Sequence, residues 1–145
     1  MRQTPSPTTA NADRVRHAYA QWHETKGGSP EAFLDLMAED VRMNTVLDPP
    51  DLHPLAHERV GIEDARDYLV SLVLHLEMIE FPTEEVVAQG DTVVWIGRCA
   101  WRDRKTGAEA RTAKVDILRF NAEGKCVSVM EMFDTLGFAR LNGLI

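Results

Sequence analysis

The stretch TVVWIGRCAWR at residues 92–102 and the stretch EARTAKVDILRF at residues 109–120 decide the fold. Both are rich in β-branched and aromatic residues with an apolar period near two, which is typical of strands. Thr106-Gly107 supplies turn chemistry between them, and strands joined by so short a connection pair antiparallel. The two stretches therefore predict a β-hairpin.

Strands at residues 84–89 and 126–134 extend this hairpin into a four-stranded meander. The connections at Gly90-Asp91 and at residues 121–124 again have the composition of turns. Short connections between neighbouring strands make the whole meander antiparallel.

Three helices are predicted before the meander, because the apolar period there is 3.6. The first helix is capped by Asn11 or Asp13. A second helix follows Ser29, a strand spans residues 40–47, and a third helix covers residues 61–76.

This order of elements predicts an α+β domain in which three helices on the N-terminal side pack on a curved, mainly antiparallel sheet. We expect a cone that encloses a small-molecule pocket. The chain has 145 residues, the size of one domain, which we place at residues 11–145. Residues 1–10 are rich in Thr, Pro and Ser and predict a disordered tail.

Antiparallel pairing sorts the side chains of the meander onto two faces. One face carries Trp95, Gly97, Cys99, Trp101, Thr112, Lys114, Asp116, Leu118, Val127, Val129, Glu131 and Phe133. The other carries Val94, Ile96, Arg98, Val115, Ile117, Met130 and Met132. Both faces are largely apolar, so we expect the helices on the first and a second copy of the chain, in a homodimer, on the second.

Three ionisable residues, Lys114, Asp116 and Glu131, share the helix-covered face with the aromatic residues. The predicted register places Lys114 opposite Glu131, so one interpretation is a structural salt bridge. The other is a pocket in which apolar walls raise the pKa of Glu131 or Asp116, so that the carboxyl moves protons. The pattern leaves both interpretations open.

Aromatic and small side chains around these charges are candidates to contact a ligand. The candidate binding residues are Tyr19, Trp22, Trp95, Cys99, Trp101, Lys114 and Phe133. The alternative is that Tyr19 and Trp22, on the buried stripe of the first helix, and the two strand tryptophans simply fill the core. Cys99 equally suits a small buried apolar position.

The formal net charge of −7 argues against nucleic acid as a partner, since phosphate binding requires clustered Lys and Arg. No apolar run approaches the roughly 20 residues of a membrane-spanning helix, and the start of the chain lacks a signal-peptide core. We therefore expect a cytoplasmic protein without a membrane partner. The two cysteines and five histidines have no metal-ligand spacing, so neither a metal nor a cofactor is predicted.

The stretch FNAEGKCVSVMEMFDTLGFARL at residues 120–141 resembles the closing hairpin and strand of the SnoaL-like branch of the nuclear-transport-factor-2-like superfamily. The segments LMAEDVR at residues 36–42 and GIEDA at residues 61–65 resemble the same family. The resemblance covers about residues 13 to 141 and implies the cone-shaped fold. This fold hosts cyclases, isomerases, dehydratases, epoxide hydrolases and proteins that only bind, so it does not choose an activity.

The resemblance also suggests roles for individual residues. Glu131 and Asp134 match an acidic pair whose first member, an Asp in the polyketide cyclases and the limonene-epoxide-hydrolase-like enzymes, is an acid or base inside the cavity. Here that position is Glu, one methylene longer. Arg98 lacks the acid that the epoxide hydrolases place two residues away, so their site is absent. Tyr19 and Asp116 imitate part of the Tyr and Asp set of ketosteroid isomerases.

The leading functional hypothesis is a cofactor-free enzyme acting on a small hydrophobic carbonyl compound by isomerisation, aldol-type cyclisation or hydration. Glu131 would be the general acid or base, and Asp116 and Lys114 would orient the substrate or tune the carboxyl. Tyr19 would donate a hydrogen bond to a developing oxyanion. The alternative is a non-catalytic small-molecule-binding or structural dimer of the same fold.

Overall fold

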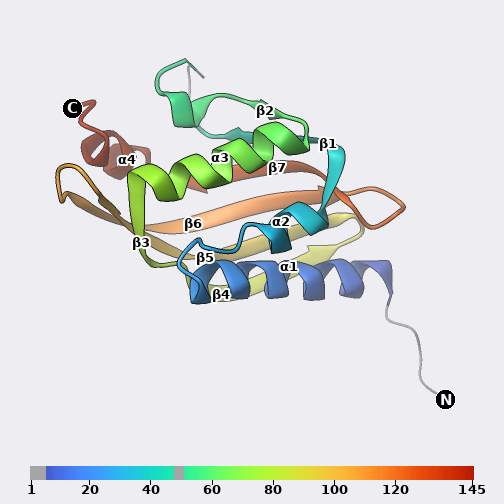
Figure 1. The fold of residues 1–145 in the computed structure, drawn as a ribbon. Helices are drawn as coiled ribbons and strands as arrows, with labels where there is room; N and C mark the ends of the chain where they lie inside the picture. The colour runs from blue at the N-terminus through green and yellow to red at the C-terminus, as the bar shows by residue number, and fades with distance from the viewer. Residues whose placement is uncertain (1–5, 48–50) are drawn as a thin grey trace.

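The computed structural model describes residues 6–47 and 51–145. Within them, the helices and strands follow one another as Figure 1 shows. They are α1 (Pro7–Glu24), α2 (Glu31–Leu36), β1 (Met37–Thr45), the 3-10 helix η1 (Pro54–Ala56), β2 (Arg59–Val60), α3 (Ile62–His75), β3 (Leu76–Glu80), β4 (Thr83–Gln89), β5 (Thr92–Asp103), β6 (Glu109–Phe120), β7 (Cys126–Phe133) and α4 (Thr135–Leu141).

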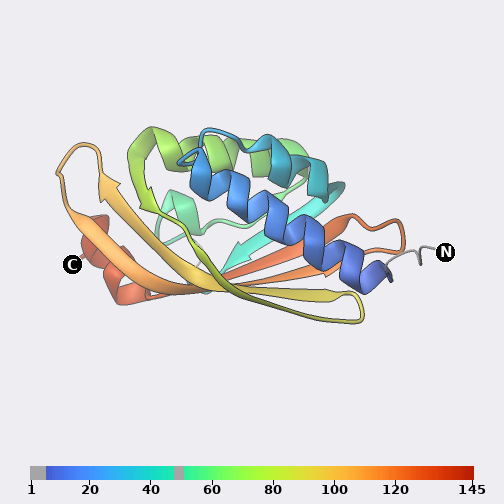
Figure 2. The same ribbon diagram turned by 90° about the horizontal axis from the view of Figure 1, so that it is seen from below.

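The strands form a curved sheet in the order β2-β1-β7-β6-β5-β3, with β4 also paired to β5. All pairs are antiparallel except β1 with β7, which is parallel. Helices α1, α2 and α3 lie together on one side of this sheet, and α4 lies at the end away from the start of α1 (Figure 2). The predicted α+β cone is confirmed.

The register of the central hairpin is the one that the sequence predicts. Trp95 pairs with Asp116, and Cys99 pairs with Thr112. On the other edge of β6 the predicted pairing of Lys114 with Glu131 is wrong by two residues. Asp116 lies opposite Glu131, and Lys114 lies opposite Phe133. A bulge between Arg119 and Phe120 contributes to this difference, because it leaves Val127 out of the ladder.

Helix α1 begins earlier than the sequence pattern suggests. Ser6 is the N-cap, and its hydroxyl accepts a hydrogen bond from the Thr9 amide at 3.2 Å. Pro7 is pre-organised for the first helical position. The predicted tail of residues 1–10 is therefore wrong for residues 7–10, which are helical, while residues 1–5 lie outside the described residues.

Two element boundaries in the middle of the chain also differ from the predictions. Met37, expected on the second helix, begins β1. Leu76, expected at the end of the third helix, begins β3, which pairs with β5. Both helices pass into strands without a Gly or Pro to mark the end, so an apolar residue continues the helical stripe and also opens the strand.

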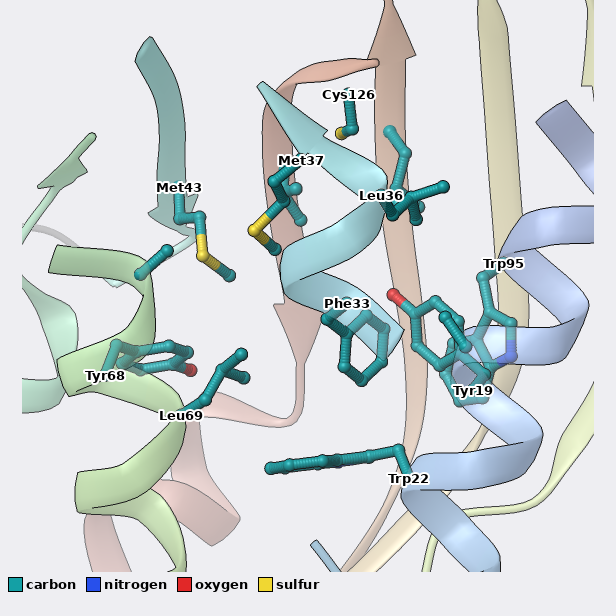
Figure 3. Close-up of a cluster of buried hydrophobic side chains, with 14 of the residues drawn as sticks. Tyr19, Trp22, Phe33, Leu36, Met37, Met43, Tyr68, Leu69, Trp95 and Cys126 are labelled. Atoms are coloured by element: carbon teal, nitrogen blue, oxygen red, sulfur yellow. The ribbon is translucent and has the colours of Figure 1, made fainter. Parts of the chain in front are cut away.

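The core fixes α1 to the sheet through aromatic contacts. The ring of Tyr19 stacks on that of Trp95, with 4.3 Å between the centroids. Figure 3 shows the two side chains together at α1. Trp95 is fully buried and its indole N–H donates to the Thr83 hydroxyl at 2.7 Å. Gly97 makes room for this ring, since a Cβ there would lie 2.5 Å from it.

Candidate functional site

A cavity of about 100 Å³ lies between the helices and the concave face of the sheet. Its wall is mainly apolar and includes side chains from α1, α2, α3, α4 and the strands. The aromatic members of the wall are Tyr19, Trp22, Phe33, Tyr68, Phe81, Trp101, Phe133 and Phe138. Such an enclosure favours a small hydrophobic molecule with few polar groups.

Three charged residues form the polar part of this wall. Lys114, Asp116 and Glu131 are all buried, at 7%, 3% and 8% exposed, and all three line the cavity. Charges at such burial are costly unless they are paired or hydrogen-bonded. The pairing scheme therefore decides what each group can do.

Both oxygens of Asp116 are occupied by donors. The Lys114 ammonium donates to Oδ1, and the Tyr19 hydroxyl donates to Oδ2 at 2.5 Å. An oxygen that accepts from an ammonium or a phenol is poorly placed to carry a proton of its own. Asp116 is therefore the acceptor of this cluster and the direct counter-ion of Lys114.

Glu131 is held on one oxygen only. Its Oε2 accepts a hydrogen bond from the Tyr68 hydroxyl at 2.8 Å and lies 3.7 Å from Lys114 Nζ. Its Oε1 has no hydrogen bond to any described residue. Even so, Oε1 is not one of the fully buried side-chain atoms that lack a hydrogen-bond partner. Glu131 lines the cavity, and Oε1 is its oxygen without a donor among the described residues.

Burial and charge shift the pKa values of this cluster in different directions. Burial raises the pKa of Glu131, the charge of Lys114 opposes this rise, and Asp116 adds to it. Burial lowers the pKa of Lys114, but the charges of Asp116 and Glu131 outweigh that effect and leave it above its ordinary value. Lys114 therefore stays charged, whereas the net effect on Glu131 is a pKa above its ordinary value.

Both tyrosines of the cluster remain protonated. Burial, followed by the neighbouring carboxyl groups, raises the pKa values of Tyr19 and Tyr68 well above their ordinary value. Each hydroxyl hydrogen is directed to one carboxyl group, that of Tyr19 to Asp116 and that of Tyr68 to Glu131. The expected donation from Tyr19 to a ligand oxyanion is thus in competition with Asp116.

The structure brings most of the predicted site residues together. Those that line the cavity are Tyr19, Trp22, Cys99, Trp101, Lys114, Asp116, Glu131 and Phe133. Trp95 does not line it, because Tyr19 covers its ring on the cavity side. Cys99 is buried, and desolvation raises its pKa to about 11, so it presents a neutral thiol.

Tyr68 was missed as a site residue by the sequence reasoning. It lies on the buried stripe of α3, a position typical of a core residue. Figure 3 shows its ring directed inward from that helix. A buried tyrosine needs a partner for its hydroxyl, which was the available signal. Its partner Glu131 is 63 positions later in the chain, so spacing alone could not identify the pair.

Asp134, the second member of the predicted acidic pair, has a structural task. Its carboxylate accepts from the amides of Leu136 and Gly137 and caps α4. Arg111 pairs with Glu80, with 3.3 Å between its Nη1 and Oε1 of Glu80. Near the same end of the cavity, the ring of His53 lies edge-on to that of Phe138, with 5.3 Å between the centroids.

Two kinds of feature are not found in the described part of the chain. Residues 6–47 and 51–145 contain no group of three His, Cys, Asp or Glu side chains arranged for a metal ion. None of their helices is long and apolar enough to cross a membrane.

Comparisons with solved structures show the same fold throughout the chain. A nuclear-transport-factor-2-like protein from Burkholderia xenovorans LB400 is 24% identical with a TM-score of 0.76, covering 92% of this chain and 96% of that one. A protein from Bacillus subtilis, provisionally assigned as an isomerase, is 17% identical with a TM-score of 0.77, covering 96% of each chain.

A third structure, provisionally assigned as a SnoaL-like polyketide cyclase from Jannaschia sp. CCS1, is 20% identical with a TM-score of 0.72. It is matched over 97% of this chain and 96% of its own. No curated protein matches the sequence. The family model described as a SnoaL-like domain matches residues 12–129, most of the chain, so this protein belongs to the SnoaL-like domain family.

Proposed function

We propose that this protein binds a small hydrophobic carbonyl compound in its cavity and catalyses acid–base chemistry on it, with Glu131 as the proton-transferring group. The observation that carries the proposal is that Glu131 lines an aromatic cavity and that its Oε1 has no donor among the described residues. A carboxyl group whose pKa is raised by burial is a suitable general acid near neutral pH. Solved structures of the same fold that are provisionally assigned as an isomerase and a cyclase are consistent with this class.

The proposed chemistry begins with the neutral Glu131 carboxyl protonating the carbonyl oxygen of the bound compound. The resulting carboxylate then removes a proton from the neighbouring carbon, so that an enol forms and Glu131 is again neutral. Lys114 stabilises the transient carboxylate by its charge, at 3.7 Å from Oε2. Asp116 keeps Lys114 charged and in place.

The test is hydrogen exchange at the carbon next to the carbonyl group. A panel of aryl and alicyclic ketones in D₂O is followed by NMR with the unaltered protein and with Glu131→Gln. We expect exchange of at least one ketone to be accelerated, and the substitution to reduce that acceleration about 100-fold or more. Glu123→Gln, an exposed turn residue, is the matched control. Equal exchange by E131Q and the unaltered protein would refute the role of Glu131.

The alternative function is binding without chemistry. This alternative is favoured by Asp116, because both of its carboxyl oxygens already accept hydrogen bonds from groups within the protein. Under this alternative, ketones bind saturably, with unchanged exchange at their carbons, and E131Q binds as well as the unaltered protein. Calorimetric titration beside the exchange assay separates the two functions.

The apolar outer face of the sheet supports a further proposal, that two copies of the chain pair through it in the cytoplasm. Val94, Ile96, Val115, Ile117 and Met130 are only half-buried there, and Met132 is 38% exposed. The face is the predicted surface for a homodimer, and covering it with a second copy removes apolar area from water. Both cysteines are free and buried, as suits a reducing compartment.

A further inference from the structure

The two carboxyl groups of the cavity differ in how their oxygens are used. Asp116 has a donor on each oxygen, whereas Glu131 has both of its neighbouring donors on Oε2. These donors are the Tyr68 hydroxyl at 2.8 Å and the Lys114 ammonium at 3.7 Å. The asymmetry determines where a proton on Glu131 can be carried.

An ammonium group has hydrogens to donate and no lone pair to accept with. A proton on Oε2 would point a positive hydrogen towards Lys114 and would displace the hydrogen bond from Tyr68. A proton on Oε1 leaves both interactions intact. When Glu131 is neutral, these contacts favour its proton on Oε1, while Oε2 acts as the carbonyl-like acceptor.

We propose that Tyr68 is a positioning residue which, by holding Oε2 of Glu131, presents the acidic hydrogen on Oε1 to the occupant of the cavity. Tyr68 acts through Glu131 and needs no contact with the reacting atoms. The functional meaning of this role rests on the proton-transfer function proposed for Glu131. The hydrogen bond itself is testable without any substrate.

Tyr68 is well fixed for such a task. It is 6% exposed, and its ring packs under the guanidinium of Arg59 from β2, with Cζ 5.4 Å from the ring centroid. The groups that face Glu131 are Lys114 and Asp116 from β6 and Tyr68 from α3, with Tyr19 of α1 and Arg59 of β2 farther away. Among them, the tyrosine hydroxyl is the one within hydrogen-bonding distance of Glu131.

The experiment compares the carboxyl group of Glu131 in the unaltered protein and in Tyr68→Phe. Infrared spectra of protein with ¹³C-labelled Glu carboxyl groups give the C=O stretch of neutral Glu131, identified by its loss in E131Q. We expect Y68F to move this band to higher frequency, because Oε2 loses a hydrogen bond. A pH titration of the same band should show a pKa raised by about one unit, since the hydroxyl also stabilises the carboxylate.

Tyr19→Phe is the matched control, since it removes the same hydroxyl group from a neighbouring buried tyrosine that donates to Asp116. We expect Y19F to leave the Glu131 band in place. An unmoved band in Y68F, or an equal shift in Y19F, would overturn the proposal. If E131Q loses the proton-exchange activity and the band behaves as expected in Y68F and Y19F, both proposals are supported. If E131Q keeps normal activity, only the proton-transfer function is refuted.

A second substitution keeps the test valid if Y68F does not fold. Incorporation of 3,5-difluorotyrosine at position 68 retains the shape of the ring and makes the hydroxyl a stronger donor. The expected shifts then have the opposite sign, to a lower C=O frequency and a lower Glu131 pKa. Absence of both shifts in folded protein would also overturn the positioning role.

Discussion

Individual residues in the cavity show how one short segment of β6 can satisfy a buried charge. Lys114 and Asp116 are two positions apart on one strand, so their side chains project from the same face and meet directly. The sequence predicted that face and all three ionisable residues on it. It could not assign their partners, because a bulge in β7 and the docking of α3 decide which donor reaches which oxygen.

Removal of Lys114 tests the energetic side of this pairing. Lys114→Met leaves Asp116 buried without its counter-ion, which is expected to lower the free energy of unfolding by roughly 3–5 kcal/mol. Urea denaturation followed by far-UV circular dichroism measures the change. Lys105→Met, in the exposed turn between β5 and β6, should alter stability little. If K114M loses less unfolding free energy than K105M, the ammonium of Lys114 is not needed to stabilise the buried Asp116.

Secondary-structure elements differ in how clearly the sequence marks them. The β5–β6 hairpin was predicted in the right register because its short turn fixes the pairing, as Trp95 opposite Asp116 shows. Strand β3 was missed because Leu76 and Met78 directly follow α3 with no helix-breaking residue between. Helix α4 was also missed, although Asp134 provides its cap. Boundaries set by tertiary pairing leave little trace in local composition.

Strand β5 contains a position at which the backbone needs glycine for reasons of space. A Cβ at Gly97 would lie 2.3 Å from the Pro82 carbonyl oxygen and 2.5 Å from the Trp95 ring. Gly97→Ala is therefore expected to destabilise the protein by about 1–3 kcal/mol and to disturb the stack of Trp95 on Tyr19. Thermal unfolding and near-UV circular dichroism report the two effects. Ala113→Ser, exposed on β6, is the control, and equal stability of the two variants would contradict the packing.

The whole molecule has one sheet with two largely apolar faces. Helices α1, α2 and α3 lie over the concave face, whereas the described residues leave the opposite face uncovered (Figures 1 and 2). Met132 on that face is 38% exposed, and Val87 is 46% exposed. The arrangement is the physical basis for the proposed homodimer.

A charge placed on the uncovered face should separate the two copies. Met132→Glu puts like charges into the proposed interface and is expected to raise the dimer dissociation constant at least about tenfold. Sedimentation velocity across micromolar concentrations measures this change. Leu74→Glu, exposed on α3 on the other side of the molecule, is the control. A monomeric mass for the unaltered protein at all concentrations would contradict the dimer.

The parallel pairing of β1 with β7 has a consequence for how the chain reaches its native state. β7 is the last strand in the order of the chain, yet it lies between β1 and β6. β7 joins β6 through a short turn, whereas its ladder to β1 joins segments about 85 to 90 positions apart in the chain. Such distant pairing slows folding. Glu131 belongs to both ladders: the short β6–β7 hairpin places it opposite Asp116, whereas its pairing with Thr45 depends on the long-range contact.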